Sequence, residues 1–124
     1  MAKILVVDDE ENIRLLYSQE LAEDGHDVTT AASAVEAVAR LEDKSFDIVV
    51  LDIKLKNESG LDLLQKIVKE RHDMPVILCT AFSGYKDDFS TWLADGYVVK
   101  SSDLTELKDE IKRVLAKKSQ RQEP

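Results

Sequence analysis

Apolar residues follow two patterns along this chain: short unbroken runs, and residues at helical spacing in the stretches between those runs. The unbroken runs are Ile4–Val7, Ile48–Leu51, Val76–Cys79 and Tyr97–Val99. Unbroken runs of this length, rich in β-branched residues, are typical of strands buried on both faces, as in parallel sheets. A weaker strand is predicted at Val28–Ala31, at or near a sheet edge. The pattern therefore predicts five strands.

The stretches between the runs carry apolar residues three or four positions apart, which is the spacing of one buried helix face. The first helix is predicted to stop at Gly25, and the second to begin at a capping box formed by Ser33 and Glu36. The third is predicted to open at Gly60, after a polar loop at 54–59. The apolar stripes of these helices are Ile13, Leu16, Tyr17 and Leu21; Val35, Val38 and Leu41; and Leu61, Leu64, Ile67 and Val68.

Two further helices are predicted in the C-terminal part of the chain. The stretch 83–93 has the weaker helical pattern, because a glycine and several polar residues dilute it. The last helix is predicted to begin near Asp103, which forms a capping-box-like pair with Glu106. Its apolar stripe is Leu104, Leu107, Ile111, Val114 and Leu115. Residues 118–124 are polar and are expected to form a frayed tail, which leaves residues 1–117 as one domain.

The alternation of strands with helices predicts an α/β fold, in which helices cover both faces of a doubly wound parallel sheet. Right-handed crossovers leave few arrangements, and the common five-stranded one is flavodoxin-like, with strand order 2-1-3-4-5. In such sheets, ligands bind at the carboxyl ends of the strands beside the switch point, here between the first and third strands. A functional site is therefore predicted at that edge of the sheet.

Polar side chains follow each of the four unbroken runs at the point where the strand ends. Asp8 and Asp9 follow the first run, and Asp52 follows the second. Thr80 and Lys100 follow the other two. Because the carboxyl ends of parallel strands meet at one edge, we expect three carboxylates, a hydroxyl and an ammonium around one small volume.

Three carboxylates in one pocket are costly unless a cation or a proton joins them, since two of them about 4 Å apart repel by roughly 1–4 kcal/mol. One lysine cannot balance them, whereas Mg²⁺ is typically held by one or two carboxylates with water and phosphate oxygens. A metal beside a free carboxylate suits phosphoryl transfer, so Asp52 is the predicted nucleophile that forms an acyl phosphate. Asp8 and Asp9 are then predicted to hold the metal. Thr80 and Lys100 are predicted to contact phosphoryl oxygens.

The composition narrows the classes of partner. The chain has 124 residues and a formal net charge of -8, with a pI near 4.7. Binding to nucleic acid or to an anionic membrane needs clustered basic residues, so neither is expected. The one cysteine, Cys79, lies in an apolar run and is predicted to be a buried, inert thiol. The N-terminal apolar run is too short for a signal peptide or a membrane span, so a cytoplasmic location is expected.

Taken together, these motifs resemble the receiver domain of the response regulators of two-component signalling, over residues 3–116. The matching segments are Val-Val-Asp-Asp-Glu at 6–10, Leu-Asp-Ile at 51–53 with a glycine eight residues after Asp52, Thr-Ala at 80–81, and Gly-Tyr-Val-Val-Lys at 96–100. Each motif alone is weak, and the combination is highly specific.

The resemblance implies a phosphoacceptor regulator rather than an enzyme, one that promotes only its own phosphorylation and dephosphorylation. Asp52 would take a phosphoryl group from a sensor histidine kinase or a phosphotransfer protein. Mg²⁺ would be bound by Asp9, Asp52 and the backbone carbonyl of Lys54, with Asp8 acting through water. Thr80 and Tyr97 match the family's switch pair, which reshapes a docking face for a downstream effector or a fused output domain that the sequence leaves open.

The sequence departs from the family pattern near Lys100. Family members usually carry a proline in a cis bond after the lysine, whereas Ser101 and Ser102 follow here. A cis bond before a residue other than proline costs about 2.5–4 kcal/mol, so the bond is either trans or a strained cis bond. The stretch from Thr80 to Lys100 is also shorter than usual, so we expect a short or irregular helix within it.

Three other functions compete with a phosphoacceptor. A phosphatase of the haloacid dehalogenase type needs a second Asp two residues after the nucleophile, where Lys54 stands. A dinucleotide-binding domain needs a Gly-x-Gly-x-x-Gly segment after the first strand, which the sequence lacks. The third is a receiver-like interaction module that phosphorylation no longer controls. It is kept as the alternative because of the unusual Lys100–Ser101 segment and the shortened helix expected before it.

Overall fold

The computed structural model describes residues 2–56, 58–71, 73–81, 93–101 and 103–122, the last four by their backbone alone. Its elements in chain order are β1 (Lys3–Val7), α1 (Glu11–Glu23), β2 (Asp27–Ala31), α2 (Ala34–Asp43), β3 (Ile48–Leu51), β4 (Lys54–Leu55), β5 (Glu58–Ser59), α3 (Gly60–Glu70), β6 (Val76–Thr80), β7 (Gly96–Val99) and α4 (Thr105–Gln122). The helix predicted at 83–93 lies, apart from Leu93, outside the described residues.

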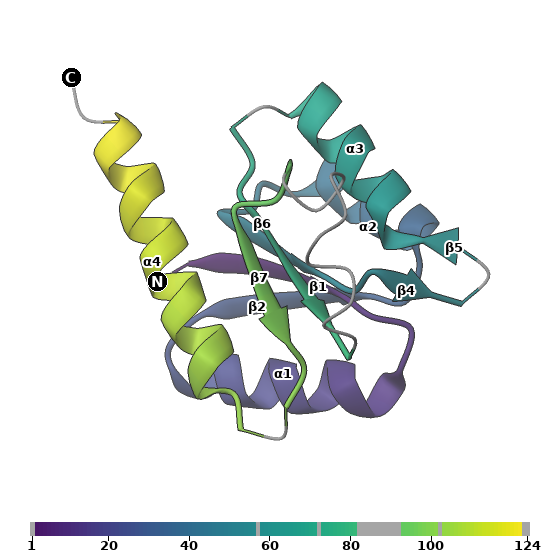
Figure 1. The fold of residues 1–124 in the computed structure, drawn as a ribbon, viewed down its shortest axis with the longest axis horizontal. Helices are drawn as coiled ribbons and strands as arrows, with labels where there is room; N and C mark the ends of the chain where they lie inside the picture. Colours follow the sequence, from purple (N-terminus) through teal and green to yellow (C-terminus); the bar gives the residue numbers. More distant parts are fainter. Residues whose placement is uncertain (1, 57, 72, 82–92, 102, 123–124) are drawn as a thin grey trace.

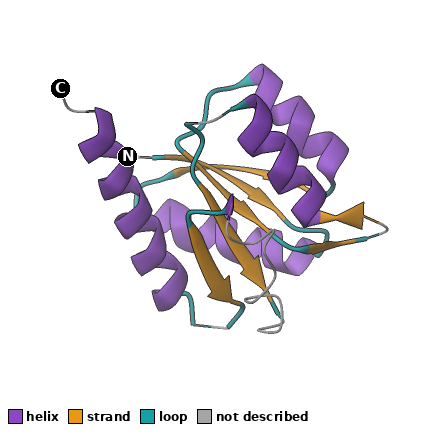
Figure 2. Cartoon of the chain, turned by 45° about the horizontal axis from the view of Figure 1, so that its top comes forward, coloured by secondary structure: helices purple, strands orange, loops and turns teal. Residues whose placement is uncertain are grey.

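Five of the strands form one parallel sheet in the order β2-β1-β3-β6-β7. Counted along the chain without the short strands β4 and β5, this is the predicted order 2-1-3-4-5, and the fold prediction is confirmed. Helices α2 and α3 cover one face of the sheet, and α1 and α4 cover the other (Figures 1 and 2). Among the described residues, no helix is both long and apolar enough to cross a membrane.

The central strands are buried on both faces, which explains why their sequences are unbroken apolar runs. In β1, Leu5 and Val7 belong to the core cluster under α2 and α3. The alternating residues Ile4 and Val6 belong to the cluster under α1 and α4. Strand β2 lies at the edge and is only half-buried over most of its length, as its weaker pattern predicted.

The helix ends agree with the sequence in part. Gly25 follows α1 with a positive φ of 89°, a conformation that glycine adopts without strain. Ser33 Oγ accepts a hydrogen bond from the Glu36 backbone N–H at 3.1 Å, as the capping box predicted. The Glu36 carboxylate accepts a hydrogen bond from the N–H of Ala32. In a standard capping box the donor would be the N–H of Ser33, one residue later in the chain.

Two segments differ from the sequence prediction. The polar loop at 54–59 contains the antiparallel pair β4–β5, in which Leu55 is buried. Strands of two residues are too short to show a period of two, so the pattern could not predict them. Helix α4 continues to Gln122, beyond the last residue of its apolar stripe and into the predicted tail. Its last turns are polar but contain no glycine or proline to end the helix.

Gly60, the first residue of α3, packs against the backbone that carries Asp52. A Cβ there would collide with the Asp52 carbonyl oxygen and lie 2.9 Å from Ile53 Cα. We expect Gly60→Ala to lower the free energy of unfolding by about 1–3 kcal/mol, because a backbone contact cannot yield without moving the strand end.

Gly96→Ala is the matched control for this substitution. Its Cβ would meet Glu110 Oε2 at 2.6 Å, which is the far end of a flexible side chain. Urea unfolding of both variants measures the difference. Equal losses at the two positions would contradict a close backbone approach at Gly60.

Candidate functional site

Hydrogen bonds of the sheet extend past the strand ends into the residues that carry the polar groups. Val7 pairs with Leu51 in the β1–β3 register. One residue further on, the Asp52 N–H donates to the Val7 carbonyl at 3.0 Å. On the other side of the sheet, the Lys100 N–H donates to the Thr80 carbonyl at 2.6 Å. The backbone therefore fixes four strand ends in register, those of β1 and β3 as one pair and those of β6 and β7 as the other.

The Lys100 ammonium lies between two buried carboxylates. Its Nζ is 2.7 Å from Asp8 Oδ2 and 3.1 Å from Asp52 Oδ2. The side chains of Lys100, Asp8 and Asp52 are only 12%, 3% and 6% exposed. The structure thus brings together three of the groups that the sequence predicted to converge.

Backbone N–H groups hold the second oxygen of each carboxylate. The Glu10 N–H donates to Asp8 Oδ1 at 2.9 Å, and the Lys54 N–H donates to Asp52 Oδ1 at 3.3 Å. Arg14 Nη1 also donates to the Asp8 carbonyl at 2.8 Å. Arg14 was not predicted to take part, because nothing in the pattern of α1 distinguishes it from a solvated arginine.

Burial raises the pKa of Asp52 to about 6, with the charge of Lys100 opposing this shift and the charge of Asp8 adding to it. Burial alone would lower the pKa of Lys100, but its hydrogen bond to Asp8 and the charge of Asp52 raise it above its ordinary value. At neutral pH, Asp52 is therefore a buried carboxylate whose charged form is poorly stabilised. Such a group gains from binding a cation.

Oxygen donors that suit Mg²⁺ lie at the end of β1. Asp8, Asp9 and Glu10 can each place one carboxylate oxygen within 4.8 Å of the others. Asp9 is half-buried and Glu10 is exposed. Carboxylate oxygen is the donor that hard divalent cations prefer, so these residues fit the ion. Glu10 was not predicted as a donor, because it follows the strand-end residues Asp8 and Asp9 and was identified only as part of the motif at 6–10.

The two predicted switch residues lie in neighbouring strands, Thr80 in β6 and Tyr97 in the edge strand β7. Thr80, the last residue of β6, is completely buried. Tyr97 pairs with Leu78 in the β6–β7 register and packs partly against the core under α2 and α3. Their role as a switch pair stays a prediction.

The Lys100–Ser101 bond is trans, since the described residues contain no cis peptide bond. Of the two conformations that the sequence left open, the chain adopts the unstrained one. Lys100 reaches both Asp8 and Asp52 with a serine, and not a proline, after it.

Cys79 lies directly beneath the site as a buried free thiol, as predicted. Its Sγ is 3.4 Å from the hydroxyl of Tyr17 on α1. Burial raises the pKa of Cys79 to about 11 and also raises the pKa of Tyr17 above its usual range. Both groups therefore stay neutral at physiological pH.

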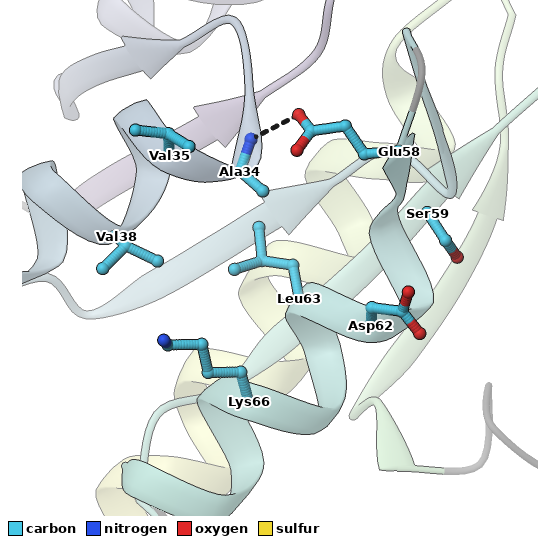
Figure 3. Close-up of a pocket in the computed structure, with 8 residues that line it drawn as sticks. All are labelled: Ala34, Val35, Val38, Glu58, Ser59, Asp62, Leu63 and Lys66. Atoms are coloured by element: carbon cyan, nitrogen blue, oxygen red, sulfur yellow. Dashed lines mark hydrogen bonds between the residues drawn. The ribbon is translucent and has the colours of Figure 1, made fainter.

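A hollow of about 550 Å³ lies between α2 and α3, away from the strand-end groups (Figure 3). Its lining is Ala34, Val35, Val38, Glu58, Ser59, Asp62, Leu63 and Lys66. The carboxylate of Glu58 accepts a hydrogen bond from the Ala34 N–H at 2.9 Å. Glu58 was predicted only as part of a polar loop, because its contact with Ala34 spans 24 positions of the chain.

Comparisons with known proteins agree with this geometry. A family model described as response regulator receiver domain matches residues 4–112. The transcriptional regulatory protein TcrX of Mycobacterium tuberculosis is 37% identical over 84% of this chain and 45% of its own length. The response regulator ArlR of Staphylococcus aureus is 29% identical over 98% of this chain and 56% of its own length. The chain thus spans about half the length of these curated relatives.

Solved structures are similar over nearly the whole chain. The response regulator TrrA of Thermotoga maritima, solved in complex with Mg²⁺-BeF, is 45% identical, with a TM-score of 0.88 over 92% of this chain and 99% of that one. A structure of TrrA in complex with the histidine kinase ThkA gives a TM-score of 0.87. A CheY-like receiver domain from Methanospirillum hungatei is 31% identical, with a TM-score of 0.91 over 98% of both chains.

Proposed function

Because this chain belongs to the response regulator receiver family, we propose that it takes a phosphoryl group from a sensor histidine kinase or phosphotransfer protein onto Asp52. The observation that carries the proposal is the buried Asp52 carboxylate, whose pKa is raised to about 6 beside Lys100 and Asp8. The complex of TrrA with a histidine kinase supports a partner of this class.

The transfer is a nucleophilic displacement at phosphorus. An oxygen of the Asp52 carboxylate forms a new bond to phosphorus, and the bond from phosphorus to the donor nitrogen breaks. The ring of the donor histidine, protonated on its other nitrogen, leaves as neutral imidazole with the electron pair of the broken bond. Lys100 exchanges its contact with Asp52 for a contact with one phosphoryl oxygen. The Thr80 hydroxyl donates a hydrogen bond to a second phosphoryl oxygen.

Mg²⁺ is the proposed cofactor, held by Asp9, Asp52 and the backbone carbonyl of Lys54, with Asp8 acting through water. When bound, it supplies positive charge that neutralises the phosphoryl oxygens. The set of carboxylate oxygens at the end of β1 supports the proposal, as does the Mg²⁺-BeF complex of TrrA.

The output is proposed to be a change in a partner-binding face through Thr80 and Tyr97, read by a downstream effector or by a further domain. Since the chain spans about half of TcrX and ArlR, the whole protein's partners are part of this proposal. The domain, residues 1–117, is proposed to be a phosphoacceptor regulator that promotes only its own phosphorylation and dephosphorylation. Its proposed location is the cytoplasm. The alternative, a module that phosphorylation no longer controls, is weakened by the contacts that Lys100 makes with Asp8 and Asp52.

Acetyl phosphate tests the proposal without a kinase. With Mg²⁺, intact-protein mass spectrometry should detect the addition of one phosphoryl group, and chelation by EDTA should prevent it. Asp9→Asn should slow the reaction by at least about tenfold, because loss of a ligand weakens the metal site. Asp109→Asn, which changes an exposed acid on α4, is the matched control and should react like the wild type.

No adduct in the wild-type protein with Mg²⁺ would contradict the proposed function and favour the alternative. An adduct that forms equally well in EDTA or in Asp9→Asn would contradict the metal site.

A further inference from the structure

Glu58 connects two parts of the fold that are distant in sequence. It lies in β5, and its Oε1 accepts the N–H of Ala34, the first residue of α2, at 2.9 Å (Figure 3). The first N–H groups of a helix have no partner within the helix, and the helix dipole places positive potential there. A carboxylate is therefore well matched to this position.

Strand pairing connects Glu58 to the backbone next to Asp52. In the β4–β5 hairpin, Glu58 pairs with Leu55, and Ser59 pairs with Lys54. The backbone N–H of Lys54 in turn donates to Asp52 Oδ1 at 3.3 Å. An unbroken series of contacts thus joins the N-terminus of α2 to the candidate phosphoacceptor.

Glu58 is not the N-cap residue of α2, although it satisfies the N–H of Ala34, one of the donors that the helix itself leaves unpaired. Ser33 already caps α2 through the Glu36 N–H, and the Glu36 carboxylate accepts from Ala32 at 3.1 Å. These contacts are made within one short segment, whereas the contact from Glu58 fastens the hairpin to a separate helix. Hairpins of two-residue strands are marginally stable alone, so an outside contact decides how firmly this one is held.

We propose that Glu58 is a positioning residue for the phosphoacceptor site. Its carboxylate fastens the β4–β5 hairpin to α2 and thereby holds the backbone of Lys54 against Asp52. The inference rests on the proposed function, in which the carbonyl of Lys54 is also a metal ligand. Removal of Glu58 therefore loosens the metal site without touching it directly.

The test compares Glu58→Ala with Glu36→Ala, since both remove a carboxylate from the N-terminal end of α2 and only Glu58 contacts it from the hairpin. Glu58→Ala should weaken Mg²⁺ binding, measured by isothermal titration calorimetry, by about tenfold, as is typical when support for a ligand is lost. Glu58→Gln, which keeps an acceptor oxygen, should recover most of the affinity. Glu36→Ala should bind Mg²⁺ like the wild type, although both alanine variants melt at a lower temperature.

Hydrogen exchange of the Lys54 amide in the metal-free proteins is the second measurement. It should be faster in Glu58→Ala and unchanged in Glu36→Ala. Equal Mg²⁺ affinities in the two alanine variants, with equal Lys54 exchange, would overturn the inference and leave Glu58 as a helix cap. If the wild type binds no Mg²⁺, the proposed function fails, and the exchange of Lys54 alone decides the role of Glu58.

Discussion

Asp52→Asn is expected to raise the free energy of unfolding of the metal-free protein at neutral pH by roughly 1–3 kcal/mol. Burial raises the pKa of Asp52 from 3.8 to about 6 in the folded state. Between these values the folded protein binds more protons than the unfolded chain. The stability that the neutral carboxyl contributes is therefore lost as the pH rises from about 4 to about 6. Asparagine carries no charge and avoids this loss.

Urea unfolding in EDTA at about pH 7.5 and about pH 5 measures the effect, which should be smaller at the lower pH. Asp62→Asn, at an exposed position on α3, is the matched control and should change little at either pH. If the Asp52→Asn variant is less stable than the wild type at the higher pH, the charged form of Asp52 is not destabilised by burial, and this expectation is wrong. The same conclusion would follow if the gain in the free energy of unfolding were equal at both pH values.

Lys100→Met is expected to have the opposite and larger effect, a loss of about 3–5 kcal/mol in the absence of Mg²⁺. The substitution keeps an apolar chain of similar length but removes the cation between Asp8 and Asp52. Both carboxylates are then buried without a charged partner, and breaking one side of a buried ion pair is costly. Added Mg²⁺ should restore part of the loss, since it supplies the missing positive charge.

Lys108→Met is the matched control for Lys100→Met. Lys108 contacts Glu20 at 3.3 Å and Asp24 at 3.5 Å, but these partners are more exposed. Pairs of that kind contribute less than about 1 kcal/mol. Similar losses in the two variants, or no recovery of Lys100→Met with Mg²⁺, would contradict the account of Lys100 as the counter-ion of the site. A combined Lys100→Met/Asp52→Asn variant should lose less than the single lysine variant, because the contacts are shared.

The strand ends of the site could be predicted because each depends on one local signal. An unbroken apolar run defines a buried strand, and in a parallel sheet the next residue lies at the common edge. Asp8, Asp52, Thr80 and Lys100 were all placed in this way, and the register of β1, β3, β6 and β7 brings their backbones together. The strand order followed from handedness and strand count, and it is the order in the structure.

The sequence could not predict contacts that depend on the packing of one segment against another. The hydrogen bond from the Ala34 N–H to Glu58 forms only because the β4–β5 hairpin packs beside α2. Strands as short as β4 and β5 have no periodic sequence pattern from which that hairpin could be predicted. The Glu36 carboxylate accepts its hydrogen bond from the N–H of Ala32 and not from that of Ser33. This choice depends on the local path of the backbone, which a capping-box pattern does not specify. The trans bond after Lys100 was likewise left open by its sequence.

The most direct test of the central claim is to locate the phosphoryl group in the wild-type chain. After reaction with acetyl phosphate and Mg²⁺, borohydride reduces an aspartyl phosphate to homoserine, which peptide mass spectrometry then locates. We expect homoserine at position 52, with Asp8 and Asp9 unmodified. Homoserine at position 8 or 9, or a phosphorylated chain in which Asp52 is intact, would contradict this expectation.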